Sequence, residues 1–90
     1  MIENCNPLIE GIIDAFLFLE LAGSDEVNPD SAVRCMESIS SSILRLHQSD
    51  QFALRQHLVS LADESTDSAY RDFVRALPDM IGLAADPIVC

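Results

Sequence analysis

The sequence predicts an all-α protein, a compact antiparallel bundle of four to five helices that forms one domain over residues 1–90. Apolar residues recur at three- and four-residue spacing in four stretches, and residues that cap helices precede these stretches. No stretch alternates apolar and polar residues over more than a few positions, so no sheet is expected. A chain of 90 residues has room for one hydrophobic core.

The helices are expected to span residues 7–22, 29–47, 50–63 and 67–77, with one further short helix at residues 79–85. The first two begin with the same signal, an Asn-Pro pair at 6–7 and again at 28–29. Asn caps the free amides of a first turn, and Pro at the first helical position loses no hydrogen bond. Gly23 is expected to end the first helix.

The expected caps of the later helices are Ser49 or Asp50 for the third and Thr66 or Asp67 for the fourth. Pro78 is expected to break or kink the fourth helix, because proline lacks the amide hydrogen that bonds one turn back. The apolar residues on the faces expected to be buried are, in chain order, Leu8, Ile9, Ile12, Ile13, Phe16 and Leu19, then Ala32, Met36, Ile39, Ile43 and Leu46, then Phe52, Leu54, Leu58, Leu61 and Ala62, and finally Ala69 or Tyr70 with Phe73, Val74 and Leu77. The apolar seam of the second helix, meaning its buried stripe, is expected to be widened by Val33, Leu44 and Cys35. Cys35 is then expected to be a buried thiol.

The charge of the chain excludes several classes of ligand. Fifteen acidic residues stand against five basic ones, all of them Arg, which gives a formal net charge of −10. Nucleic acids and anionic membrane surfaces are bound through clustered Lys and Arg, so neither is an expected partner. The chain contains no Lys, which removes the phosphate-binding loop, the Schiff-base site and the Ser-Lys dyad.

No motif in the chain names a reaction, so an enzyme is not expected. Cys5, Cys35 and Cys90 lie far apart and form no Cys-x-x-Cys pair. His47 and His57 have no further ligand at a metal-binding spacing. We therefore expect no cofactor and no bound metal.

The chain as given is expected to act in the cytoplasm. Its first residues lack the basic segment of a signal peptide. Its longest apolar run covers only residues 15–19, whereas spanning a bilayer takes about 18 or more apolar residues.

The first helix carries more apolar surface than its core face needs. Glu10 and Asp14 mark a polar stripe, and Leu17, Phe18 and Leu21 continue the same stripe one and two turns later. Two interpretations stay open. Either this helix is central in the bundle and the C-terminal segment covers its far end, or the three apolar residues form an exposed patch beside carboxylates, which is typical of docking surfaces.

Two further groups of carboxylates lie in predicted loops and at helix starts: Asp25, Glu26 and Asp30 in the first group, and Asp63, Glu64 and Asp67 in the second. Helical spacing predicts three ion pairs that absorb part of this acidity: Asp30–Arg34, Asp67–Arg71 and Asp72–Arg75. Arg45 and Arg55 have no acid at that spacing, so they reach acids on other helices or serve a partner. Even with every Arg paired, ten acids remain, and this surplus indicates high solubility or a partner with a basic surface.

In size, acidity and helical pattern, the whole chain resembles the small, acidic, mainly helical immunity proteins of bacterial toxin–immunity pairs. The resemblance implies a non-catalytic protein that binds a toxin domain and blocks its active site or its substrate groove. The surface expected to bind the partner combines the stripe on the first helix with the two loop clusters: Glu10, Asp14, Leu17, Phe18, Leu21, Asp25, Glu26, Asp30, Asp63, Glu64 and Asp67.

Two other classes of protein stay open. One is a chaperone-like adaptor for a secreted effector, which holds its client on apolar surface and usually works as a dimer. The other is a phage-encoded acidic inhibitor of a nucleic-acid enzyme, which would favour carboxylates spread along one face. The oligomeric state also stays open, with a homodimer as one alternative.

Overall fold

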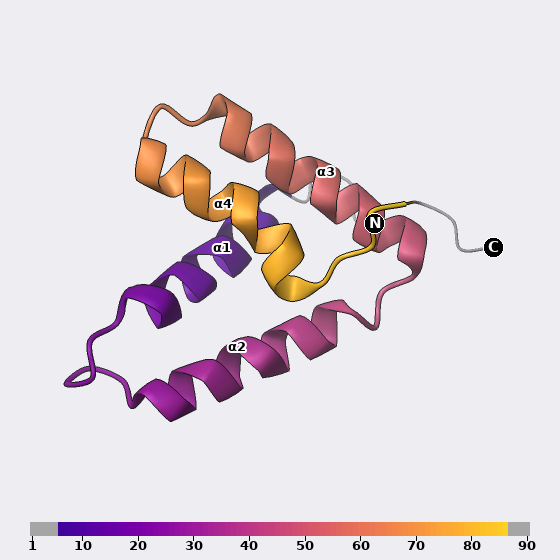
Figure 1. The fold of residues 1–90 in the computed structure, drawn as a ribbon. Helices are drawn as coiled ribbons and strands as arrows, with labels where there is room; N and C mark the ends of the chain where they lie inside the picture. The colour runs from indigo at the N-terminus through magenta and orange to yellow at the C-terminus, as the bar shows by residue number, and fades with distance from the viewer. Residues whose placement is uncertain (1–5, 87–90) are drawn as a thin grey trace.

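The computed structural model describes residues 6–86, with the side chain of Asn6 excepted, and shows an all-α bundle. Its helices are α1 (Asn6–Leu21), α2 (Pro29–Ile43), α3 (Gln48–Glu64) and α4 (Ser68–Ile81), and no strand occurs in this range (Figure 1). The predicted fold class is therefore confirmed. The expectations for the Asn6 cap, for Cys5 and Cys90, and for the apolar tail at 87–90 lie outside the described residues.

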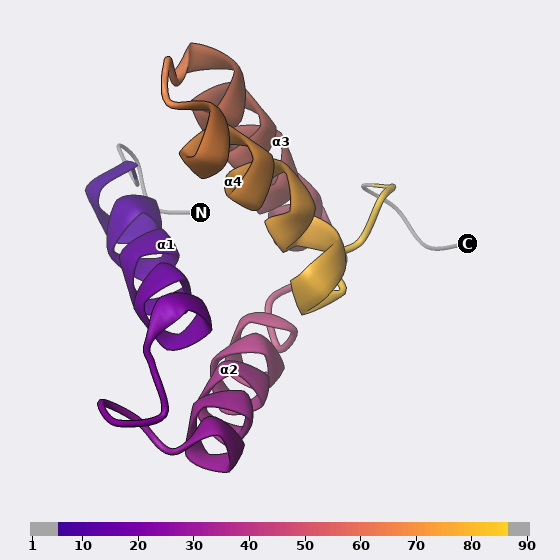
Figure 2. The same ribbon diagram turned by 60° about the vertical axis from the view of Figure 1, so that its left-hand side comes forward.

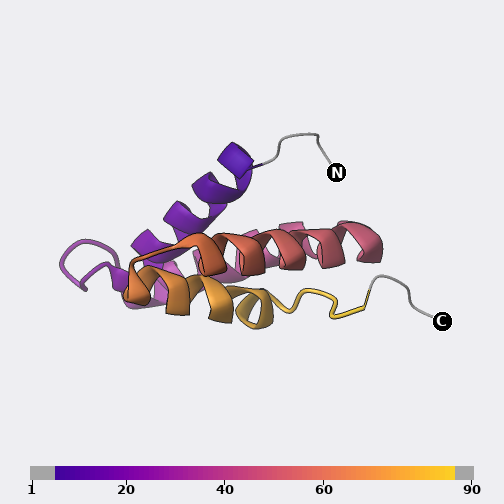
Figure 3. The same cartoon turned by 90° about the horizontal axis from the view of Figure 1, so that it is seen from above.

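The helices form an antiparallel hairpin with two helices packed across it. α3 and α4 run side by side in opposite directions, and α1 crosses them at a steep angle (Figure 3). α2 packs against α1 and against α4, and Figure 2 shows it leading from the end of α1 to the start of the hairpin. The bundle measures 44 × 30 × 21 Å along its principal axes.

The core lies where α1 meets the hairpin. α1 contributes Ile9, Ile13 and Phe16, which recur at the predicted three- and four-residue spacing. The remaining members come from every other helix and from the segment after α4: Ile43, Leu54, Leu58, Ala62, Val74, Leu77, Ile81 and Leu83. This set confirms most of the apolar seams predicted for the first, third and fourth helices. Leu8 is an exception, because 55% of its surface is exposed.

α2 is shorter and less buried than predicted. It ends at Ile43 instead of residue 47, and the chain turns through Leu44 and Leu46, both exposed. Val33 and Cys35 are also exposed, so the expectation of a buried Cys35 thiol is wrong. The reason is geometric, because α2 turns only one of its faces to its neighbours. Within the helix only Ala32 and Ile43 are buried, while Met36 and Ile39 are half-buried against the core.

α3 starts two residues earlier than predicted, and neither predicted cap is used. His47 is the residue before the helix, and its side chain makes no cap hydrogen bond. Gln51 stabilises the preceding turn instead, because its Nε2 donates to the carbonyls of Leu44 and Leu46, each at 3.0 Å. The side-chain amide therefore satisfies carbonyls that the end of α2 leaves open.

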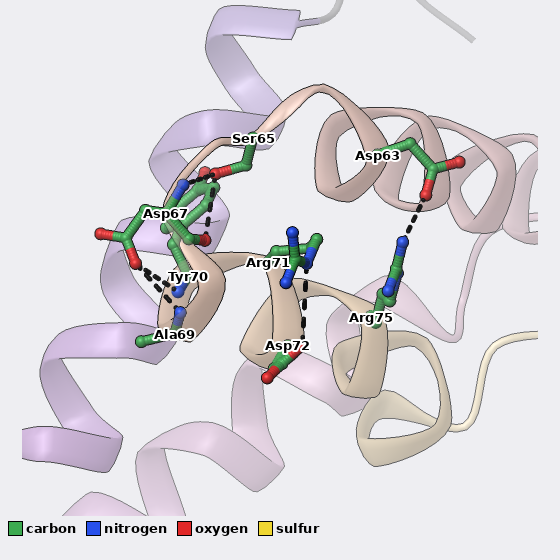
Figure 4. A network of polar contacts seen from close by, with 8 residues as sticks. All are labelled: Asp63, Ser65, Asp67, Ala69, Tyr70, Arg71, Asp72 and Arg75. Carbon is green, nitrogen blue, oxygen red and sulfur yellow. Dashed lines mark hydrogen bonds and ion pairs between the residues drawn. The ribbon is translucent and has the colours of Figure 1, made fainter.

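α4 begins as predicted but ends later. The Asp67 carboxylate accepts hydrogen bonds from the amides of Ala69 and Tyr70, at 3.0 and 3.2 Å (Figure 4). The predictions of a break at Pro78 and of a separate helix at 79–85 are wrong, since α4 continues through Pro78 to Ile81. The final turn closes on the left-handed Gly82 (φ 91°), and the amide of Leu83 donates to the Pro78 carbonyl at 3.0 Å.

Polar side chains of α3 hold the segment that follows α4. The Arg55 guanidinium donates from Nη2 to the Leu83 carbonyl at 2.6 Å and from Nε to the Ala84 carbonyl at 3.1 Å. It also pairs with Asp79 at 3.1 Å. The amide of Ala84 donates to Gln51 Oε1 at 3.2 Å. This network confirms that Arg55 reaches an acid on another helix.

Candidate functional site

The polar stripe on α1 turns apolar toward the end of the helix, and that end is exposed. Phe18 keeps 54% of its surface exposed and Leu21 keeps 73%, while Leu17 is half-buried. Glu10 and Asp14, one and two turns earlier, are exposed as well. Within residues 6–86 no segment covers these side chains, so this part of the chain fits the interpretation of an exposed patch beside carboxylates and not that of a covered central helix.

Leu17 and Leu21 form a ridge with a hollow on each side. On one side lies a groove of about 390 Å³ between α1 and the first half of α4, which we call the α1–α4 groove. Its lining consists of the two ridge residues together with Asp67, Ala69, Tyr70 and Phe73. Long side chains of both helices thus border one shared, mainly apolar groove.

On the other side of the ridge lies a hollow of about 420 Å³ beside the α1–α2 loop, which we call the loop hollow. It is lined by Phe18, Ala22, Asp14 and Glu26 in addition to the ridge. The loop is closed by the Gly23 carbonyl, which accepts from the amides of Glu26 and Val27 at 2.9 and 3.0 Å. This turn brings the Glu26 carboxylate close to the end of α1.

Carboxylates surround the ridge. The pKa of Tyr70 is raised above its ordinary value, first by burial and then by the charges of Asp14 and Glu10. Glu26 and Asp67 complete the set from the loop and from the start of α4. We call these four side chains the flanking carboxylates: Glu10, Asp14, Glu26 and Asp67.

The two predicted loop clusters are divided by the structure. Each contributes one member to the ridge, Glu26 from the first and Asp67 from the second. The other members are exposed and line neither the groove nor the loop hollow: Asp25, Asp30, Asp63 and Glu64. The ridge therefore joins parts of all three sequence-predicted regions into one surface.

The three ion pairs predicted from helical spacing are wrong. Arg75 reaches across the hairpin to Asp63 Oδ1 at 2.8 Å instead of pairing with Asp72 (Figure 4). Arg71 Nε lies 3.9 Å from Oδ1 of its neighbour Asp72, while the Asp67 carboxylate caps α4. Within residues 6–86, none of the flanking carboxylates forms an ion pair with an arginine. Their charge is therefore not neutralised by a neighbouring cation in this part of the chain.

A second groove, of about 490 Å³, lies between α2 and the end of α4, and the sequence analysis missed it. Val33 and Met80, each 48% exposed, border it together with Leu44. On α2 and just after it, the apolar border consists of Val33, Met36 and Leu44, whereas Glu37, Ser40 and Ser41 are polar. The sequence interpretation places Val33 and Leu44 in the buried seam of this helix, because periodicity does not tell which apolar face a neighbour covers.

Within residues 6–86, the structure offers no arrangement suited to metal chemistry, since no three His, Cys, Asp or Glu side chains cluster at metal-binding distance. No helix in this range is long and apolar enough to cross a membrane. What the surface around the ridge provides is apolar area framed by negative charge.

Comparisons of the chain with protein-family models, with curated proteins and with solved structures find no match.

Proposed function

We propose that this protein is a non-catalytic binding module of the cytoplasm that neutralises a bacterial toxin domain, as an immunity protein does. The observation that carries the proposal is the ridge of the half-buried Leu17 and the exposed Leu21, which lies beside the exposed Phe18 and is framed by the flanking carboxylates. The expected partner is a domain with a basic surface that surrounds an apolar patch.

The apolar part of this surface supports binding rather than folding. Phe18 and Leu21 each leave more than half of their surface in water, although the same helix buries Phe16 almost completely. A partner that covers them gains about 25 cal/mol for each Å² of apolar area removed from water. Exposed aromatic and aliphatic side chains of this kind are typical anchors of protein interfaces.

The charge supports a basic partner. A net charge of −10 opposes the compact state through self-repulsion, and the flanking carboxylates add to that cost without arginine partners among residues 6–86. A basic surface brought against them relieves the repulsion and is steered toward the site by the field. Toxin domains that act on nucleic acids carry basic clefts of this kind.

The adaptor for a secreted effector is the second candidate, and the groove between α2 and α4 favours it. An adaptor needs several apolar surfaces for one extended client, and this protein exposes two, the ridge and the α2–α4 groove. The two functions differ in what the partner does when it is expressed alone.

The test begins with affinity capture from the cells that encode the protein. The wild type is compared with Leu21→Gln and with the matched control Leu8→Gln, which changes another exposed leucine on the same helix. A protein retained by wild type and control but lost with Leu21→Gln is then expressed in a naive bacterial host. The proposal expects growth arrest that co-expression of the wild type relieves.

A partner that causes no arrest, or an arrest that the wild type does not relieve, overturns the toxin proposal. Failure of the capture to distinguish Leu21→Gln from Leu8→Gln overturns the assignment of the surface. A captured partner that is harmless and remains unfolded without this protein favours the adaptor.

A further inference from the structure

We infer that the α1–α4 groove receives an amphipathic α-helix of the partner, with lysine or arginine beside its apolar face. This inference rests on the proposed function and names the element of the partner that occupies the site. It follows from the shape of the groove, its apolar lining and the position of the flanking carboxylates.

A helix fits the groove better than an extended segment. An extended peptide that binds by strand addition needs a sheet edge, and residues 6–86 contain no strand. The backbone amides of α1 and α4 are engaged within the helices, so side chains alone are available for contact. Grooves between two helices accept a third helix through apolar anchors at i, i+4 and i+7.

The spacing of the apolar lining matches such anchors. On the α1 side, Leu17 and Leu21 lie four residues apart, which corresponds to about 6 Å, or one helical turn, at a rise of 1.5 Å for each residue. Apolar anchors at i and i+4 of a partner helix cover the same distance. On the α4 side, Ala69 and Phe73 are one turn apart and present a small and a large side chain to the same groove.

The charge selects the chemistry of the partner helix. Asp67 lines the groove itself, and Asp14 and Glu10 act on the Tyr70 hydroxyl at its wall. Lysine or arginine on either flank of an apolar stripe would face these carboxylates while the stripe contacts the ridge. A second copy of this chain fits poorly as the occupant, because it would bring the same carboxylates and another net charge of −10 against them.

The probes for this inference are three synthetic peptides of equal length. The first has leucines at i, i+4, i+7 and i+11 with lysines on both flanks. The second replaces every lysine with glutamate, and the third keeps the composition of the first but scrambles its order, which abolishes the apolar face. Binding to the full chain is measured by calorimetry and located by amide chemical shifts in NMR spectra.

We expect the lysine peptide to bind and to shift the amides of Leu17, Leu21, Ala69 and Phe73 most strongly. The glutamate and scrambled peptides are expected to bind at least about tenfold more weakly. Equal binding of the scrambled peptide, or shifts centred on the α2–α4 groove, overturns the inference. Absence of binding by the lysine peptide overturns it as well.

Matched variants separate apolar contact from charge. Leu21→Gln is expected to weaken the lysine peptide about tenfold, while Leu8→Gln leaves its affinity unchanged. Asp14→Asn, which removes a flanking carboxylate, is expected to weaken it more than Glu20→Gln, which removes an exposed charge of the same helix that lines neither the groove nor the loop hollow. Equal effects of the two charge variants would mean that the affinity depends on the net charge of the protein and not on the position of the carboxylate, which overturns the inference.

The outcomes distinguish this inference from the proposed function. If the captured partner is a neutralised toxin but the lysine peptide neither binds this protein nor displaces the partner, the proposed function stands and the inference of a partner helix in the groove is overturned. If the lysine peptide binds in the groove but the captured partner is harmless, the inference of a partner helix stands and the proposal of a toxin partner is overturned. If sedimentation shows a dimer that the lysine peptide dissociates, a second copy is the occupant and the inference is overturned.

Discussion

Phe16 and Phe18 lie two positions apart on α1 but in opposite environments, with 2% of the first side chain exposed and 54% of the second. Two residues along a helix correspond to a rotation of about 200°, so the two rings point away from each other. Phe16 packs into the core with Ile9 and Ile13, and Phe18 lines the loop hollow. One helix therefore serves the fold with one face and the candidate site with the other.

Replacing these two residues separates stability from binding. Phe16→Ala is expected to lower the free energy of unfolding by about 3–5 kcal/mol, because it leaves a cavity among fully buried side chains. Phe18→Ala is expected to change it by less than about 1 kcal/mol and to weaken binding of the captured partner. Chemical denaturation measures the first effect and calorimetry the second. Equal destabilisation by both variants would contradict the assignment of Phe18 to an exposed surface.

Much of the fold was predictable because its signals are local. The Asn28 and Asp67 side chains cap α2 and α4 through hydrogen bonds to amides two and three residues away. The extension of α4 past Pro78 was not predictable, because it depends on tertiary packing: Pro78 is fully buried, and the turn that follows is tied to α3 through Arg55. Packing overrode the local preference of proline in the last turn of this helix.

The candidate site was predictable only in part, for a related reason. Helical periodicity placed Leu17, Phe18 and Leu21 on one stripe with Glu10 and Asp14. In the structure Glu10, Asp14, Phe18 and Leu21 are exposed and Leu17 is half-buried. The opposite wall of the groove comes from α4, far away in the sequence. No local pattern reports that Tyr70 and Phe73 lie beside the end of α1.

Substitution by alanine is expected to change the stability of the protein in opposite directions at two of its glycines. Gly11 lies in the interior of α1, and a Cβ added there meets no atom within 4 Å. Gly11→Ala is therefore expected to stabilise the protein by roughly 0.5–1 kcal/mol. Gly82 has a φ of 91°, and its Cβ would meet only the end of the Leu44 side chain at 3.9 Å. Gly82→Ala is expected to cost about 1–2 kcal/mol through backbone strain alone.

Thermal melts of the two glycine variants provide the measurement. Gly82→Asn serves as the control, because Asn adopts the left-handed conformation more readily than Ala. It is expected to lose less stability than Gly82→Ala. A stabilising effect of Gly82→Ala would contradict the left-handed end of α4.

Arg55 is expected to hold the segment after α4 in place. Its guanidinium donates to the carbonyls of Leu83 and Ala84, and hydrogen bonds from charged groups contribute about 1.5–3 kcal/mol. Arg55→Ala is therefore expected to lower stability by about 1–3 kcal/mol. Amide hydrogen exchange should report faster exchange at residues 83 and 84. Arg45→Ala, at an exposed arginine in the α2–α3 turn, is the matched control and should change stability by less than about 0.5 kcal/mol.

Tyr70 is expected to titrate above its ordinary pKa, because burial and the charges of Asp14 and Glu10 disfavour the phenolate. The folded state then keeps the phenol proton to higher pH than the unfolded state. The corresponding stability is fully present below a pH of about 10 and is lost as the pH rises through the pKa of the folded state. Tyr70 is the only tyrosine and the chain has no Trp, so ultraviolet absorbance follows it directly.

The Tyr70 titration also tests the electrostatics of the groove. Asp14→Asn is expected to lower the pKa of Tyr70 without restoring its ordinary value, because burial is the larger cause. Glu37→Gln, on α2, removes the same charge away from Tyr70 and should leave the titration unchanged. An unshifted pKa in Asp14→Asn would show that Asp14 does not face the Tyr70 hydroxyl.

The last prediction concerns how the flanking carboxylates steer a basic partner. The double variant Glu26→Gln with Asp67→Asn removes two charges beside the ridge, and Asn at position 67 retains the ability to cap α4. The control, Asp25→Asn with Asp30→Asn, removes the same total charge from exposed positions outside the groove and the loop hollow. Both variants are compared with the wild type.

The measurement is stopped-flow association with the captured partner from low to physiological salt. At low salt the first variant is expected to associate about three- to tenfold more slowly than the wild type, and the control less than about twofold more slowly. This difference is expected to shrink as added salt shortens the Debye length to about 8 Å. Equal rates for the two variants would mean that overall charge, and not the carboxylates around Leu17 and Leu21, guides the encounter.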